Sequence, residues 1–125
     1  MLAVALAHHE GALRASLLAE YGLRLSVART WPATEVAELV AWLPAGSPFW
    51  RAYGGPVSLT VEQQELRAVT YWLQVLDYRE RGSKGTQPKP PMVPPLASER
   101  RDEESLDRRK AEAFKRRASR LHSPS

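Results

Sequence analysis

The stretch TWPATEVAELVAWLPAGSPFWRAYGG, residues 30–55, decides the fold class, because it contains two helices separated by clear stop and start signals. From Pro32 onward, apolar residues recur at the three- and four-residue spacing of one helix face. Thr30 is the expected N-cap, and Pro44 ends the helix. The apolar face consists of Val36, Leu39, Val40 and Leu43.

The second helix of this stretch is predicted over residues 48–53. Ser47 is the expected N-cap, and Pro48 suits the first helical position, where a missing N–H costs nothing. The two glycines at positions 54 and 55, followed by proline, end the helix. For so short an element it carries large apolar side chains, namely Phe49, Trp50 and Tyr53.

Toward the N-terminus, residues 5–21 form an Ala- and Leu-rich segment that predicts one helix. Gly22 follows its last apolar residue and suits a left-handed C-cap. The residues expected on its apolar face are Leu13, Leu17, Leu18 and Tyr21.

Toward the C-terminus, the longest helix is predicted over residues 61–81. Thr60 and Gln63 match a capping box at its start. An apolar stripe follows, and a stripe this wide is typical of a core-facing helix, although in a small domain part of it could face a partner. The stripe consists of Leu66, Val69, Leu73 and Leu76, and is widened by Tyr71, Trp72 and Val75.

Residues 82–97, GSKGTQPKPPMVPPLA, contain five prolines and two glycines, so neither a helix nor a central strand fits them. Residues 98–125 form a charged tail whose few large apolar residues are too sparse for a buried helix. We therefore predict an all-α protein: a bundle of about four helices in residues 1–81, a Pro/Gly-rich linker, and a tail that is either disordered or a single helix.

The net charge of +4 is divided unevenly along the chain. Residues 1–80 carry six arginines and eight acidic residues, together with every Trp and Tyr. Residues 81–125 carry twelve basic and six acidic residues. The basic character therefore belongs to the tail, and the expected globular part is slightly acidic.

No group of residues matches a catalytic or metal site. Adjacent histidines on a helix point about 100° apart, so His8 and His9 cannot share an ion unaided. The chain has no Cys, which excludes disulfide and thiolate chemistry. Its serines lack a nucleophile elbow and a His partner. We expect no enzymatic activity, no metal and no cofactor.

The apolar start MLAVALA does not resemble a signal peptide, because no basic residues precede it and His8, His9 and Glu10 follow at once. No apolar run approaches the roughly 18 residues that a membrane span needs. The sequence therefore favours a soluble cytoplasmic protein with no membrane partner. It leaves the oligomeric state open.

Aromatic residues are dense in the first eighty positions, and two interpretations fit them: core packing of a small helical domain, or a docking surface for another protein. Under the second interpretation, the candidates for contact with a partner are Trp42, Trp50, Tyr53, Trp72 and Leu76.

The basic tail also has several interpretations: a solvated tail, a contact with an acidic protein, or a contact with nucleic acid. Acidic residues are interleaved with the basic ones, and the tail has no Trp or Tyr on which a base could stack, so nucleic acid is disfavoured. The basic clusters are Arg108, Arg109 and Lys110, and Lys115, Arg116 and Arg117.

The order of these segments resembles a domain family of tailed bacteriophages and prophages of actinobacteria, whose members are often labelled tail assembly chaperones. The resemblance covers about residues 8–95. It is carried by AEYGL at residues 19–23 after a Leu-rich helix, by Leu43-Pro44 followed by Gly46-Ser47 and an aromatic turn, and by the Gly/Lys/Pro-rich exit. Many relatives have a Trp shortly after paired arginines in the second helix, whereas this chain has Trp31 and Trp42.

This resemblance implies an assembly factor of the host cytoplasm that coats the helical tape measure protein until tail-tube subunits replace it. Some such chaperones are made as frameshift fusions. Two alternatives remain open. One is a structural minor tail or connector protein of the virion, and the other is an accessory protein that binds nucleic acid through the basic tail.

Overall fold

The computed structural model describes residues 2–121, with side chains through residue 119. The described residues form seven α-helices, one 3-10 helix and no strand, which confirms the predicted all-α class. The chain divides into two compact units between Pro94 and Pro95. The elements are α1 (Leu2–His8), α2 (Glu10–Tyr21), α3 (Leu25–Ala28), α4 (Ala33–Ala41), α5 (Pro48–Tyr53), η1 (Pro56–Ser58), α6 (Val61–Glu80) and α7 (Ala97–Leu121).

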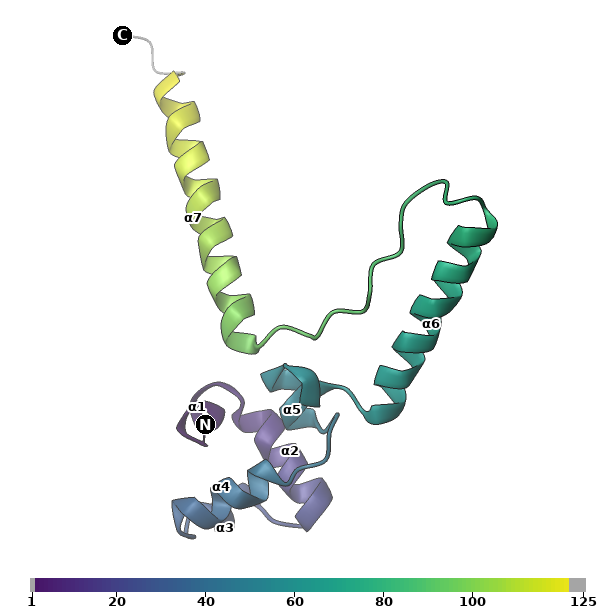
Figure 1. Ribbon diagram of the computed structural model, residues 1–125. Helices are drawn as coiled ribbons and strands as arrows, with labels where there is room; N and C mark the ends of the chain where they lie inside the picture. The colour runs from purple at the N-terminus through teal and green to yellow at the C-terminus, as the bar shows by residue number, and fades with distance from the viewer. Residues whose placement is uncertain (1, 122–125) are drawn as a thin grey trace. The chain divides into compact units, whose positions relative to one another are not determined.

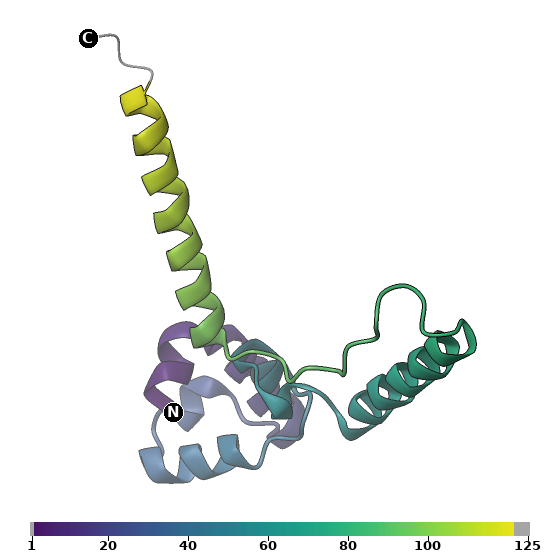
Figure 2. The same ribbon diagram turned by 45° about the horizontal axis from the view of Figure 1, so that its top comes forward.

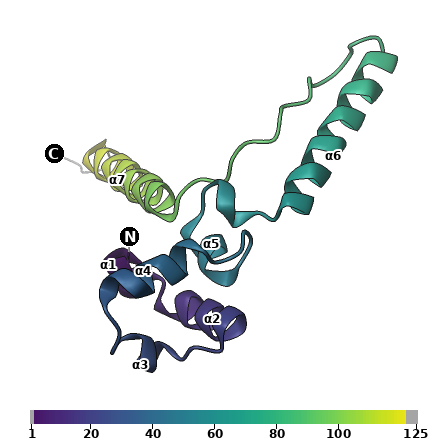
Figure 3. The same ribbon diagram turned by 60° about the horizontal axis from the view of Figure 1, so that its bottom comes forward.

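The core of the first unit lies among helices α1 to α5 (Figure 1). Phe49 of α5 is fully buried at its centre. Helix α2 packs against both α5 and α4, as Figure 3 shows. The other buried apolar residues are Ala5, Leu13, Leu17, Leu25, Ala28, Val36, Val40, Leu43 and Trp50.

The N-terminal segment forms two helices, not the single predicted one. His9 separates them with φ −132° and ψ 27°, which is not helical. This change of direction brings Ala5 of α1 into the core, while Leu18 and Tyr21 at the far end of α2 stay exposed. Gly22 adopts the expected left-handed conformation, with φ 63°, and its N–H bonds to a carbonyl at the end of α2.

The start of α4 also differs from the prediction. Its N-cap is Pro32, and the hydroxyl of Thr30 instead donates a hydrogen bond of 2.7 Å to the carbonyl of Val27. Thr30 therefore closes the short helix α3, which the sequence pattern did not predict. The apolar face of α4 is placed as expected, with Val36 and Val40 buried.

Helix α5 has the predicted bounds, and α6 begins at the predicted capping box. The hydroxyl of Thr60 accepts from the backbone N–H of Gln63, and the Gln63 side chain accepts from the backbone N–H of Thr60. The amide of Gln64 donates to two carbonyls of the preceding loop, those of Pro56 and Leu59. These bonds tie the first turn of α6 to the chain that leads into it.

The proline-rich linker returns along α6 (Figure 2). The guanidinium of Arg67 donates to the carbonyl of Met92 at 2.9 Å, and the N–H of Gly55 donates to the carbonyl of Pro94 at 3.1 Å. Two surface depressions are lined jointly by α6 and by linker residues between positions 84 and 91. The linker is thus held at its far end by backbone carbonyls, the groups that a proline-rich segment still offers.

The second unit is essentially the helix α7. Its first turn is closed by the carboxylate of Glu99, which accepts from the N–H of Leu96 at 2.9 Å. Of the two structures predicted for the tail, a disordered chain or a single helix, the structure has the helix. Leu106 and Phe114 are both exposed on it.

Candidate protein-binding surface

The apolar stripe of α6 is exposed. None of the twenty residues of this helix, all of them described, is buried. The prediction that this wide stripe is mainly core is therefore wrong, and its other interpretation, a face left open to a partner, agrees with the exposure. We call its four central residues the α6 seam: Leu66, Val69, Leu73 and Leu76, each between 55% and 66% exposed.

The spacing within the α6 seam is three, four and three residues. This is the a/d spacing of a coiled coil, in which each apolar side chain packs between side chains of a facing helix. Exposed apolar residues in a continuous row are typical of an interaction site, whereas single exposed ones are ordinary. The heptad spacing, and not the number of aromatic residues, is the sequence signal that identifies this surface.

The opposite side of α6 is the one that the linker partly covers. Arg67, Tyr71 and Tyr78 are half-buried there, and they follow the helix at four- and seven-residue spacing. Arg67 binds the linker directly. The side chains of Tyr71 and Tyr78 line the depressions shared with the linker. The linker therefore covers the back of the helix and borders on the α6 seam only at Leu66, which lines one of these depressions and is still 66% exposed.

Acidic groups surround the start of this surface. Glu62 and Glu65 lie in the first two turns of α6, where carboxylates complement the helix dipole. Hydrogen bonds from the backbone N–H of Glu62 and from the Thr60 hydroxyl hold the pKa of the Glu62 carboxyl below its ordinary value. Glu62 therefore stays ionised at neutral pH and gives this end of the helix a fixed negative charge.

The five predicted contact residues differ in exposure: three lie on the surface, and two pack in or against the core. Trp72 and Leu76 are exposed on α6, and Trp42 at the end of α4 is 83% exposed. Trp50 is only 9% exposed, and Tyr53 is half-buried against the core. Trp50 and Tyr53 are thus reassigned to core packing, and the surface candidates are the other three.

The reason for this burial is the short helix α5 itself. Its rings pack against one another, tilted for Phe49 and Trp50 with centroids 5.0 Å apart, and edge-to-face for Trp50 and Tyr53 with centroids 5.7 Å apart. The indole N–H of Trp50 donates to the carbonyl of Leu43 at 3.0 Å. The ring of His9 packs edge-on against Phe49 and Tyr53, so His9 contributes to the packing around α5.

The six basic residues predicted as tail contacts all lie exposed on α7. They do not form a uniform positive face, because acidic residues alternate with them along the helix. Asp107, for example, pairs with Lys110 at 3.7 Å. An exposed pair of this kind contributes little to stability.

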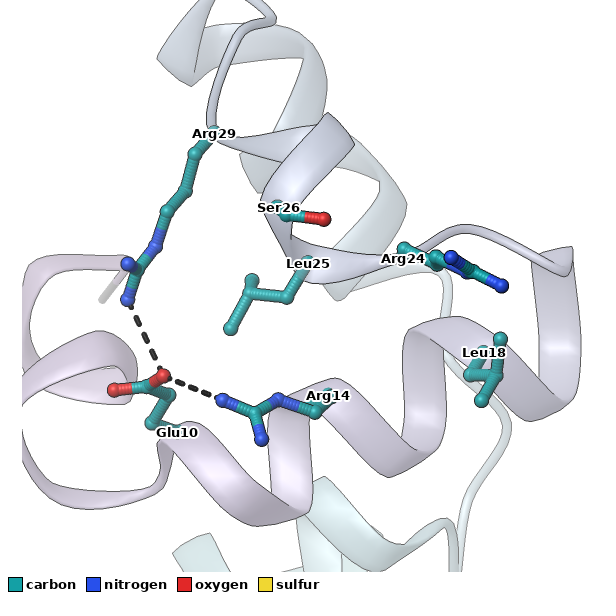
Figure 4. Close-up of a pocket in the computed structure, with 7 residues that line it drawn as sticks. All are labelled: Glu10, Arg14, Leu18, Arg24, Leu25, Ser26 and Arg29. Carbon is teal, nitrogen blue, oxygen red and sulfur yellow. Dashed lines mark hydrogen bonds and ion pairs between the residues drawn. The ribbon is translucent and has the colours of Figure 1, made fainter.

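A separate depression of about 370 Å³ lies between α2 and α3 (Figure 4). One carboxylate oxygen of Glu10 pairs with Arg14 at 2.9 Å and with Arg29 at 3.3 Å. Arg24 and Ser26 complete the charged and polar lining. Sequence reasoning did not identify this cluster, because its members come from two helices. The Glu10 pairs join α2 to the end of α3, and Ser26 has no histidine beside it in this depression to act as a base.

The part of the chain described here holds no cluster of His, Cys, Asp or Glu that could bind a metal ion. Among the same residues, no helix is both long and apolar enough to cross a bilayer. The α6 seam, an exposed row of apolar side chains, is the candidate surface for contact with another polypeptide. Comparison of the chain with protein-family models, with curated proteins and with solved structures finds no match.

Proposed function

We propose that this chain is a tail assembly chaperone that binds the tape measure protein during phage tail morphogenesis, and that it is not an enzyme. The observation that carries the proposal is the exposed α6 seam, a row of apolar side chains at heptad spacing that are each more than half exposed. The sequence resemblance to tail-module proteins supplies the identity of the partner. The site of action is the host cytoplasm, where tails are assembled.

A long helical partner suits this surface physically. A heptad seam buries best against another helix whose apolar residues have the same spacing. Each seam side chain is already partly covered, with 55% to 66% of its surface exposed, so contact contributes roughly 1 kcal/mol per side chain. The total is modest, and a chaperone that tube subunits must later displace needs a modest affinity.

The proposal is tested by producing the tape measure protein in bacteria with and without this chain and measuring its soluble fraction. We expect the chain to raise that fraction, and Leu73→Asp to abolish the effect by placing a charge in the α6 seam. Gln74→Asp is the matched control, because Gln74 is exposed on the next position of the same helix but outside the seam. Equal solubility with and without the chain would overturn the proposal.

The protein composition of the virion distinguishes the chaperone from the alternative, a minor tail or connector protein. A chaperone is absent from purified virions, whereas a minor tail or connector protein is present at a fixed copy number. Mass spectrometry of purified particles therefore decides between the two.

A second candidate, binding to nucleic acid, is supported by one observation: α7 exposes six clustered basic side chains. Its test is a gel shift with DNA at several salt concentrations, because phosphate contacts release counterions and weaken steeply as salt increases. We expect no salt-dependent shift with the wild-type chain. A shift that Arg116→Glu together with Arg117→Glu removes would support this candidate over the chaperone.

A further inference from the structure

The flanks of the α6 seam carry a charge pattern that the seam alone does not explain. Glu65, Trp72 and Arg79 follow one another at seven-residue spacing, so they lie along one edge of the seam. Glu65 and Arg79 are at opposite ends of this edge. Both are exposed, and neither forms an ion pair with another described residue.

We propose that the α6 seam pairs with the same helix of a second copy of this chain, in antiparallel orientation. The seam is symmetric about its middle, so reversing one helix keeps every apolar layer matched. Leu66 then faces Leu76 of the second copy, and Val69 faces Leu73 of the second copy. The two-fold axis passes near Trp72, and the interface is isologous.

Charge complementarity selects the antiparallel orientation. In an antiparallel pair, residues on the same edge of each seam meet, so Glu65 lies opposite Arg79 of the second copy. Symmetry forms this pair twice. In a parallel pair, Glu65 would lie opposite Thr70 and Trp72 opposite Asp77, and no opposite charges would meet. The charges on this edge of α6 thus favour an antiparallel dimer over a parallel one.

The remaining contacts of α6 are compatible with this pairing. The linker is bound by Arg67 and covers the side that carries Tyr71 and Tyr78. Of the α6 seam it borders only on Leu66, which stays 66% exposed. Asp77, on the other edge, is already paired with Arg81 at 2.7 Å and needs no partner from the second copy. The second helix can therefore approach without displacing a bond of the first.

Two heptads form a short interface, smaller than the standard size for stable complexes. We therefore expect a dissociation constant on the order of micromolar or weaker. The pair covers the same side chains that the proposed function assigns to the tape measure protein. Self-pairing then shields the α6 seam in the free protein, and a longer helical partner replaces the second copy. The inference concerns the chain alone and holds whether or not the tape measure protein is that partner.

The test is sedimentation equilibrium of the full chain, up to about millimolar concentration, with charge variants on the edge of the α6 seam. We expect the wild-type chain to form dimers. Glu65→Arg and Arg79→Glu should each raise the dissociation constant about tenfold, because two attractive pairs become two repulsive ones. Glu38→Arg makes the same charge change at an exposed position of α4 and should have no effect.

A mixture of the two single variants gives the decisive result. In a mixed antiparallel pair, the arginines of one variant face the glutamates of the other, so the heterodimer should form as tightly as the wild-type dimer. The double variant, with both changes in one chain, should also dimerise with the dissociation constant of the wild-type chain. Circular dichroism checks that each variant keeps its helices.

Three outcomes would overturn the inference: a wild-type chain that stays monomeric, a dimer that is indifferent to Glu65→Arg, or single variants that remain helical but do not associate when mixed. A failure of the tape measure solubility assay would leave all of these measurements unaffected. The inferred dimer and the proposed function can therefore fail separately.

Discussion

The backbone N–H of Phe49 donates a hydrogen bond of 2.9 Å to the hydroxyl of Ser16, and both residues are fully buried. Phe49 is the second residue of α5, where a helix has no internal acceptor for its N–H groups. Ser16 lies on α2, thirty-three positions earlier. A serine of one helix therefore caps the first turn of another and fastens α5 to the core.

Ser16, and not the expected N-cap residue Ser47, caps the first turn of α5 with its side chain. Ser47 is at the N-cap position, yet its side chain makes no capping bond and its hydroxyl has no partner among the described residues. We expect Ser16→Ala to lower the free energy of unfolding by about 1–3 kcal/mol, because it leaves a buried N–H without an acceptor. Ser47→Ala should change it by less than about 0.5 kcal/mol. Urea denaturation of both variants measures the difference, and an equal loss would contradict the assignment.

The tryptophans should differ just as clearly. Trp50→Ala removes a buried ring and its bond to the carbonyl of Leu43, so it should cost about 3–5 kcal/mol and unfold much of the domain. Trp42→Ala removes a ring that is 83% exposed and should leave the thermal midpoint almost unchanged. Calorimetry of the two variants provides the comparison. A large loss at Trp42 would show that its ring is covered in solution.

Two glycines provide a matched pair for backbone strain. Gly22 has φ 63°, and alanine there should destabilise by about 1 kcal/mol because side chains disfavour the left-handed region. Gly11 is inside α2, and a Cβ there meets nothing within 4 Å. Gly11→Ala should therefore stabilise by about 0.5–1 kcal/mol. The two thermal midpoints should move in opposite directions, and movement in the same direction would argue against the C-cap.

The start of α6 should respond to acid through Glu62. Its pKa is lower in the folded chain than in the unfolded one, so its contribution to stability is present above the unfolded pKa of about 4.3 and is lost as the pH falls through the folded value. Thr60→Ala removes the hydroxyl that donates to this carboxylate. The same hydroxyl accepts from the backbone N–H of Gln63, so this capping bond is lost as well. We expect the pKa of Glu62 to rise in this variant, and the first turn of α6 to exchange its amide hydrogens faster. Carboxyl titration by NMR measures the first effect, and an unchanged pKa would contradict it.

The amino-acid sequence by itself determined the elements whose signals are local. The α5 boundaries follow from Pro48 and from the glycines after Tyr53, and the α6 start follows from the Thr60–Gln63 capping box. The apolar face of α4 was also predictable, because one helix period places Val36 and Val40 together. Local backbone chemistry and periodicity act over a few residues, so they can be read without knowing the fold.

Only the tertiary structure decided which apolar faces are buried and which hydroxyls act as caps. Trp50 and the side chains of the α6 seam are all apolar residues on the apolar face of a predicted helix. Trp50 is buried because α5 packs among α1 to α4, whereas no residue of α6 is buried. The choice of Ser16 over Ser47 as a cap likewise depends on residues brought together from distant positions. Burial is a property of how elements meet in space, because the hydrophobic effect acts on surface removed from water, whichever part of the chain removes it.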